Sequence, residues 1–179
     1  LALYELEVED LDALQAVSDE HMRRIEADEM HRSPPETIDR DNVRSMYFAE
    51  TGPRLGGHDA VPETLFMPFT EPVSEEDDEE FNRWYQEVHL PEVLDVPGFS
   101  AASRYKETGM NMTGRPWPIN FPYLALYELG DGSKEAFDNA MKELRRRISE
   151  GDRMEISDAL GSDKITQVYS RITDRIIAI

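Results

Sequence analysis

The hexapeptide Leu-Ala-Leu-Tyr-Glu-Leu occurs twice in this chain, at residues 1–6 and again at 124–129. An amphipathic helix pattern and then a strand pattern follow each copy. The match continues in four later pairs: Asp41 with Asp163, Val43 with Ile165, Tyr47 with Tyr169 and Thr51 with Thr173. Such agreement in residue and context rarely arises by chance, so we interpret the two segments as sister copies of one folding pattern.

The second copy belongs to a longer run of elements. Residues 64–172 predict strands at 65–69, 99–106, 123–129 and 165–172, with a helix after the first strand and another, capped by Ser133, after the third. This strand–helix–strand–strand–helix–strand order is that of a ferredoxin-like unit. The first copy supplies only the later half: a strand at 1–7, a helix capped by Asp10 and a strand at 43–50.

We therefore predict an α+β fold with three parts. Residues 1–55 form the second half of a first ferredoxin-like unit, 56–63 form a linker, and 64–179 form a complete unit. The chain begins with Leu1 and not Met, which favours a longer protein whose first strand–helix–strand precedes this chain. The alternative is that the half unit is complete in itself.

Apolar side chains line the predicted sheet, as Leu65, Met67 and Phe69 on one strand and Leu124 and Leu126 on another illustrate, and we expect both of its faces to be apolar. Helices cover one face, and the other needs a cover as well. We expect tandem units packing sheet to sheet as a (pseudo-)dimeric α/β barrel, either within one chain or in a homo-oligomer.

The composition narrows the classes of partner. Asp and Glu number 38 against 19 Lys and Arg, a formal charge of −19, which disfavours nucleic acid and anionic membranes. Cysteine is absent, which excludes disulfides and thiolate chemistry. No apolar run approaches the ~20 residues of a membrane span, and no signal-peptide pattern is visible. We expect a cytoplasmic protein.

Residues 81–105 contain the candidate chemistry. Phe81, Trp84, Tyr85 and Val88 form one helical apolar stripe, which His89 shares, and we expect Pro91 to stop the helix. Pro97-Gly98 predicts a turn, and the strand after it carries Ala102, Arg104 and Lys106 on one face.

These residues resemble a known group of proteins. The segments Phe81-Asn-Arg-Trp-Tyr, His89-Leu-Pro, Val96-Pro-Gly-Phe and Ser103-Arg-Tyr, followed by Tyr123-Leu-Ala-Leu-Tyr-Glu, are similar to the EthD-like branch of the dimeric α/β-barrel superfamily. That superfamily includes cofactor-independent monooxygenases, isomerases, polyketide cyclases, dehydratases and haem enzymes. The resemblance implies a pocket between sheet and helices, with His89 and Arg104 as motif residues.

Three residues are candidates for catalysis. His89 can exchange a proton near pH 7, or it can be a structural histidine at a helix end. Arg104 can hold a carboxylate or enolate bidentately, or it can pair with one of the many acids. Tyr85 can donate to an oxyanion, or it can be a core residue.

Further residues are candidates for contacts with the substrate. We expect Trp84 and Tyr123 to lie close to the catalytic candidates. The long loop 108–122 can be a lid over the pocket, or it can equally pack against a neighbouring unit. His21 corresponds to the apolar Leu144 in the repeat, so it either serves a site or marks a shift in register. The candidates for binding are Trp84, Asn111, Trp117, Asn120, Tyr123 and His21.

No histidine spacing typical of a zinc or iron site is present, so we predict no metal and no cofactor, while a lone histidine leaves haem open. We expect a small-molecule enzyme: a cofactor-independent, general acid/base lyase, isomerase or cyclase. Its substrate would be largely apolar, aromatic or polyketide-like. The alternatives are a cofactor-independent monooxygenase and a non-catalytic ligand-binding barrel.

Overall fold

The computed structural model describes residues 1–29, 39, 43–57, 61–110, 119–152 and 154–173. The chain divides into two compact units. The first comprises Leu1–Tyr47 and Glu107–Pro118, and the second comprises Phe48–Lys106 and Ile119–Ile179.

Helix α1 (Leu11–Glu26) belongs to the first unit. Asp10 caps it as predicted, because its side chain accepts a hydrogen bond of 2.8 Å from the Ala13 N–H. Of the apolar side chains expected on one face, Leu14 is buried, whereas Leu11 and Val17 are exposed.

The strand predicted at residues 1–7 is not formed. This segment has no regular secondary structure, and Leu1, Leu3, Tyr4 and Leu6 are exposed. A strand needs a neighbouring strand to satisfy its N–H and C=O groups, and no strand of the described residues lies in a ladder with this segment. The strand predicted at 43–50 is also shorter than expected, since only Phe48–Glu50 is strand.

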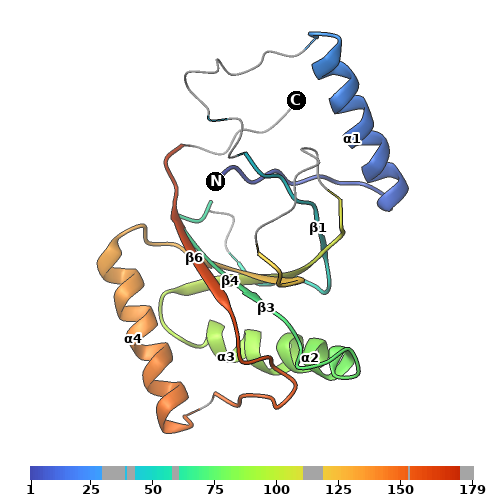
Figure 1. Ribbon diagram of the computed structural model, residues 1–179. Helices are drawn as coiled ribbons and strands as arrows, with labels where there is room; N and C mark the ends of the chain where they lie inside the picture. Colours follow the sequence, from blue (N-terminus) through green and yellow to red (C-terminus); the bar gives the residue numbers. More distant parts are fainter. Residues whose placement is uncertain (30–38, 40–42, 58–60, 111–118, 153, 174–179) are drawn as a thin grey trace. The chain divides into compact units, whose positions relative to one another are not determined.

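A six-stranded sheet forms the second unit (Figure 1). Its strands are β1 (Phe48–Glu50), β2 (Leu55–Gly56), β3 (Thr64–Thr70), β4 (Phe99–Glu107), β5 (Tyr123–Leu129) and β6 (Ile165–Ser170). They lie in the order β1-β4-β5-β3-β6, with β2 also paired to β4.

The four long strands confirm the order of elements that the sequence predicts. β4, β5, β3 and β6 are neighbours in that order and pair antiparallel, an α+β arrangement compatible with a ferredoxin-like unit. β1 lies in the predicted first part and β2 spans the boundary between that part and the predicted linker, and both strands pair with β4 of this sheet.

Helices cover one face of this sheet (Figure 1). They are α2 (Asp78–Trp84), the π-helix η2 (Tyr85–His89), α3 (Leu90–Leu94) and α4 (Lys134–Glu150). Ser133 caps α4 as predicted, since its side chain accepts from the Ala136 N–H. The core between helices and sheet includes the buried side chains of Phe66, Phe81, Trp84, Tyr85, Leu90, Val93, Phe99, Tyr123, Tyr127, Leu129 and Leu144.

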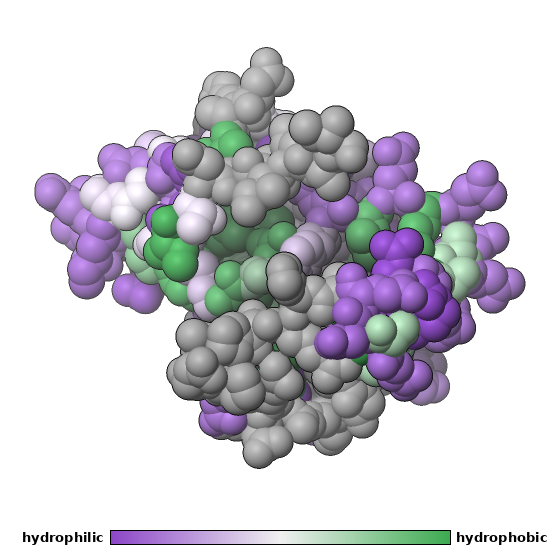
Figure 2. Space-filling view, turned by 90° about the horizontal axis from the view of Figure 1, so that it is seen from above, coloured by the Kyte–Doolittle hydropathy of each residue, from purple (hydrophilic) through white to green (hydrophobic). Residues whose placement is uncertain are grey.

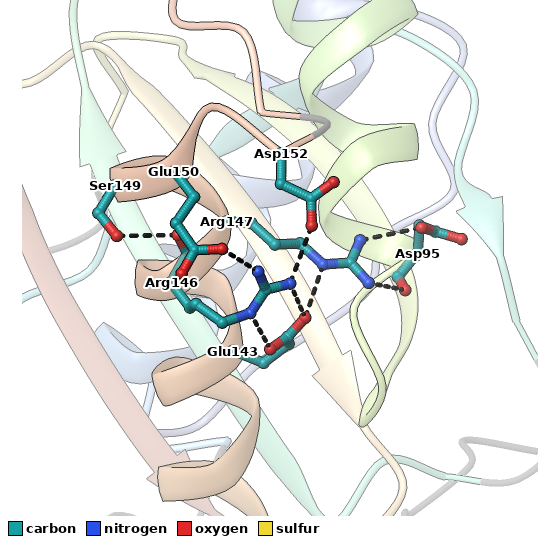
Figure 3. A network of polar contacts seen from close by, with 7 residues as sticks. All are labelled: Asp95, Glu143, Arg146, Arg147, Ser149, Glu150 and Asp152. Atoms are coloured by element: carbon teal, nitrogen blue, oxygen red, sulfur yellow. Dashed lines mark hydrogen bonds and ion pairs between the residues drawn. The ribbon is translucent and has the colours of Figure 1, made fainter.

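A network of charged side chains joins α4 to the end of α3 (Figure 3). Arg147 bonds to the Asp95 carboxylate at 2.9 Å and to the Asp95 carbonyl at 3.2 Å. Glu143 accepts from both Arg147 and Arg146, and Arg146 also reaches Asp152. This network links two helices of the layer that covers the candidate site.

Hydrophilic residues lie at the left and right sides of the face that Figure 2 shows, as the excess of acidic residues leads one to expect, and apolar residues are visible nearer its centre. Among the described residues, no helix is both long enough and apolar enough to cross a lipid bilayer.

Candidate functional site

The helical run above the sheet changes its pitch at Tyr85. The regular α-helix ends at Trp84, and the Leu90 N–H then donates to the Tyr85 carbonyl, five residues back, as in a π-helix. The prediction that Pro91 stops the helix is wrong, because the chain stays helical to Leu94. Pro91 has no N–H to donate to the Glu87 carbonyl and its ring crowds that group, and the wider turn accommodates both effects.

This π-turn sets the positions of two candidate side chains. Tyr85 is buried, and His89 lies beside it, with their ring centroids 4.8 Å apart and the planes nearly perpendicular. On its other side the His89 ring stacks on Trp84 at 4.8 Å. His89 is partly exposed as a residue, but its Nδ1 atom is buried and has no hydrogen-bond partner.

Strand β4 places Arg104 under these rings. Arg104 lies opposite Ala125 of β5, so its diagonal neighbours on the same face are Tyr123 and Tyr127. The residue is only 1% exposed. Its guanidinium carbon lies 4.1 Å from the centroid of the Tyr85 ring, which gives a cation–π contact in a dry environment.

One nitrogen of this guanidinium group is held by an amide. Nη1 of Arg104 donates to Oδ1 of Asn82 at 2.9 Å. The Asn82 amide nitrogen donates in turn to the Tyr123 hydroxyl at 2.9 Å, and that hydroxyl donates to Asp78 at 2.6 Å. The Asp78 carboxylate thus reaches Arg104 only through neutral groups, and Arg104 has no direct ion pair among the described residues.

Burial and charge shift the pKa values of these groups. Burial, followed by the positive charges of Arg104 and Lys164, lowers the pKa of His89 from 6.5 to about 4, so the ring is neutral at pH 7. Burial raises the pKa values of Tyr85 and Tyr127, although the nearby Arg104 opposes both shifts.

Unsatisfied polar atoms gather around Arg104. Among the described residues, the buried side-chain nitrogen and oxygen atoms without a partner are Thr70 Oγ1, Gln86 Oε1, His89 Nδ1, Arg104 Nε, Arg104 Nη2 and Tyr127 OH. His89 and Arg104 belong to one neighbourhood, because the charge of Arg104 contributes to the low pKa of His89. The hydroxyl groups of Thr70 and Tyr127 lie close enough to Tyr85 for hydrogen bonding to lower the pKa of that tyrosine, so the unpaired atoms that define the cluster are His89 Nδ1, Arg104 Nε and Arg104 Nη2. Unpaired buried groups are costly, and their concentration in one place is typical of a binding site.

The structure brings together five of the residues that the sequence singled out: His89, Tyr85, Arg104, Trp84 and Tyr123. The Trp84 indole donates to the Glu155 carbonyl at 3.0 Å, so Trp84 also has a structural role.

The other candidates belong to other segments of the chain. Asn120 is exposed in the segment before β5, and His21 is a partly exposed residue of α1 in the first unit. Asn111 and Trp117 lie outside the described residues.

Sequence reasoning missed four polar members of the cluster: Asn82, Asp78, Thr70 and Tyr127. Strand alternation puts Tyr127 on the same sheet face as Tyr123, so this pattern could have predicted Tyr127 as a member of the cluster. Asp78 lies in the first turn of α2, and its carboxylate accepts a hydrogen bond from the Tyr123 hydroxyl. Within the described part of the chain, no group of three or more potential metal ligands is present.

No family model matches this chain, and no curated protein matches it either. The resemblance to the EthD-like branch therefore depends on the quoted motif residues.

Proposed function

We propose that this protein is a cofactor-independent enzyme of the lyase, isomerase or cyclase type that works by general acid/base catalysis. The observation that carries the proposal is a neutral imidazole, His89, whose buried and unpartnered Nδ1 lies in the cluster of Arg104 and Tyr85. A largely apolar aromatic or polyketide-like substrate suits a site formed mainly by aromatic rings.

In the proposed mechanism, His89 removes a proton from carbon and returns it at another position. The negative charge that develops on the substrate oxygen is stabilised by the Arg104 guanidinium and by the Tyr85 hydroxyl. Charge on the substrate also offsets the positive field of Arg104, which is one cause of the low pKa of His89. The base therefore strengthens as the substrate acquires negative charge.

A non-catalytic ligand-binding barrel is the second candidate. The low pKa of His89 favours it, because an imidazole with a pKa of about 4 is a weak base at neutral pH. In that case a ligand binds beside Arg104 and leaves unchanged.

Deuterium exchange tests the proposal. Aromatic ketones with an acidic α-C–H are incubated with the protein in D2O, and the loss of the proton signal is followed by NMR. We expect wild-type protein to accelerate exchange without consuming oxygen, and His89→Gln to reduce the acceleration by ~10²–10⁴. The control is Arg83→Lys, which changes an exposed residue of the same helical run and should exchange at the wild-type rate.

An unchanged rate in His89→Gln refutes the assignment of the base. Ligand binding without exchange in the wild type supports the binding protein instead, and oxygen uptake during turnover supports a cofactor-independent monooxygenase.

We propose a finer architecture as well. The repeated hexapeptide and the apolar residues Met67, Phe69 and Leu124 on the sheet face opposite the helices favour sheet-to-sheet packing of tandem units or of two copies, as in the EthD-like branch. Light scattering distinguishes the two, because an intramolecular pseudo-dimer has the mass of one chain. A cytoplasmic location is proposed on composition alone.

A further inference from the structure

We infer that the edge of Arg104 formed by Nε and Nη2 is the binding site for the carboxylate group of a small aromatic acid. This inference rests on the proposed function and deepens it, because it names the class of substrate that the site accepts.

The chain itself shows what this edge of an arginine binds. Four other arginines donate from Nε and Nη2 to the two oxygens of a single carboxylate, at distances between 2.7 and 3.1 Å. The pairs are Arg23 with Glu20, Arg54 with Glu128, Arg83 with Glu80, and Arg146 with Glu143. Two parallel N–H groups match the spacing of the two carboxylate oxygens, which makes this arrangement specific as well as strong.

Arg104 presents the same edge without an acceptor. Both Nε and Nη2 are buried and unpartnered, while Nη1 is fixed by Asn82. The two parallel N–H groups of this edge, here called the fork, are therefore held in a defined orientation by the hydrogen bond to Asn82 and by the contact with the Tyr85 ring. A buried cation without a direct counter-ion is costly to the folded protein, and a bound anion removes this cost.

The surroundings select among anions. The guanidinium carries one positive charge, which a carboxylate balances, whereas a phosphate monoester brings nearly two negative charges. The guanidinium carbon also lies within about 5 Å of three aromatic ring centroids, those of Tyr85, Phe81 and Tyr123. These aromatic side chains favour a ligand whose carboxylate is attached to a flat, apolar group such as an aromatic ring.

The test is a titration of the wild-type protein followed through the Nε–H signals of its arginines in nitrogen–proton NMR spectra. The probes are sodium benzoate, its neutral isostere benzamide, phenyl phosphate, and sodium formate as the smallest carboxylate. We expect benzoate and formate to shift the Arg104 Nε–H signal, which Arg104→Lys identifies by its loss. Benzamide and phenyl phosphate should leave the signal in place.

Affinity measurements on variants complete the test. Arg104→Lys keeps the charge but lacks the fork, so benzoate affinity should fall at least tenfold. The matched control, Arg83→Lys, alters an exposed arginine that uses the same edge and should bind benzoate like the wild type. Should Arg104→Lys fail to fold, the wild-type titration decides the question, with the signal then assigned from the wild-type spectrum.

The inference is overturned if benzoate does not shift the Arg104 signal, if phenyl phosphate shifts it as benzoate does, or if benzamide binds as tightly as benzoate. This outcome differs from failure of the proposed function. Loss of the base, as in His89→Gln, should leave benzoate binding in place, so carboxylate binding without deuterium exchange supports the site and refutes only the chemistry.

Discussion

Replacing Arg104 by methionine should make the folded protein more stable. Arg104 is buried, its Nε and Nη2 atoms have no partner, and no carboxylate among the described residues bonds to it. Methionine has a similar length and carries no charge, so the substitution removes the cost of desolvating the guanidinium group.

The magnitude follows from opposing contributions. Replacement of a buried ion pair by apolar side chains of similar volume is often stabilising by ~1–4 kcal/mol, because the cost of desolvating the charges is removed. Here the variant also loses the hydrogen bond to Asn82 and the contact with the Tyr85 ring, which together offset part of the gain. We therefore expect Arg104→Met to raise the free energy of unfolding by ~1–2 kcal/mol, the lower part of the range for such replacements.

Arg54→Met is the matched control, with the opposite expected sign. Arg54 binds both oxygens of Glu128, at 3.1 and 2.7 Å, and the Glu128 side chain is 11% exposed. Its loss leaves a nearly buried carboxylate without a partner, so this variant should lose ~1–3 kcal/mol. Urea unfolding followed by tryptophan fluorescence measures both variants, and an unchanged dependence on urea shows that the unfolded states are comparable.

A loss of stability in Arg104→Met similar to that in Arg54→Met refutes the reasoning. It would mean that the Nε–Nη2 edge of Arg104 is satisfied in the free protein, and the inference of a carboxylate site would lose its basis.

Two further predictions concern stability. The pKa of His89 is about 4 in the folded protein against an ordinary value of 6.5. As the pH falls, the His89 side chain of the unfolded chain is therefore protonated first, which favours unfolding. The free energy of unfolding should decrease between pH 6.5 and pH 4 by at most ~3 kcal/mol. Denaturation across this range should show a smaller decrease in His89→Gln, and an equal decrease contradicts the shifted pKa. Gly98 has φ +108° and a Cβ there would lie 3.2 Å from Cβ of Ala140, so Gly98→Ala should cost ~1–3 kcal/mol in urea unfolding. Gly130→Ala, which meets no atom within 4 Å, should be nearly neutral, and equal losses in the two variants contradict the strain argument.

Features that depend on nearby residues were predictable from sequence. The caps at Asp10 and Ser133 form as expected, because a cap needs only a side-chain oxygen and an N–H three residues on. Strand β5 has the predicted limits, Tyr123–Leu129, since its residues favour strands and turn signals flank them.

The candidate site was predictable only in part. The helical spacing correctly placed Trp84 and Tyr85 on the buried side, and strand alternation correctly placed Arg104 with Ala102. The π-turn was not foreseen, because regular helical spacing continues the stripe through Val88, whereas the chain buries Leu90 fully, five residues after Tyr85. The role of Asn82 depends on a contact with a strand residue 22 positions away, which no local pattern contains.

The repeated hexapeptide shows how strongly neighbours decide the conformation of a segment. Its second copy is strand β5, which lies between β4 and β3 and has hydrogen-bonding partners along both edges. Its first copy has the same six residues and the same intrinsic preference, yet it is not a strand, and the described residues offer it no neighbouring strand. Identity of sequence alone therefore does not establish tandem sheets, and the tandem proposal requires a pairing partner for residues 1–6. A second copy of this chain is one such partner, which makes the oligomeric state the property that decides between the tandem and single-sheet descriptions.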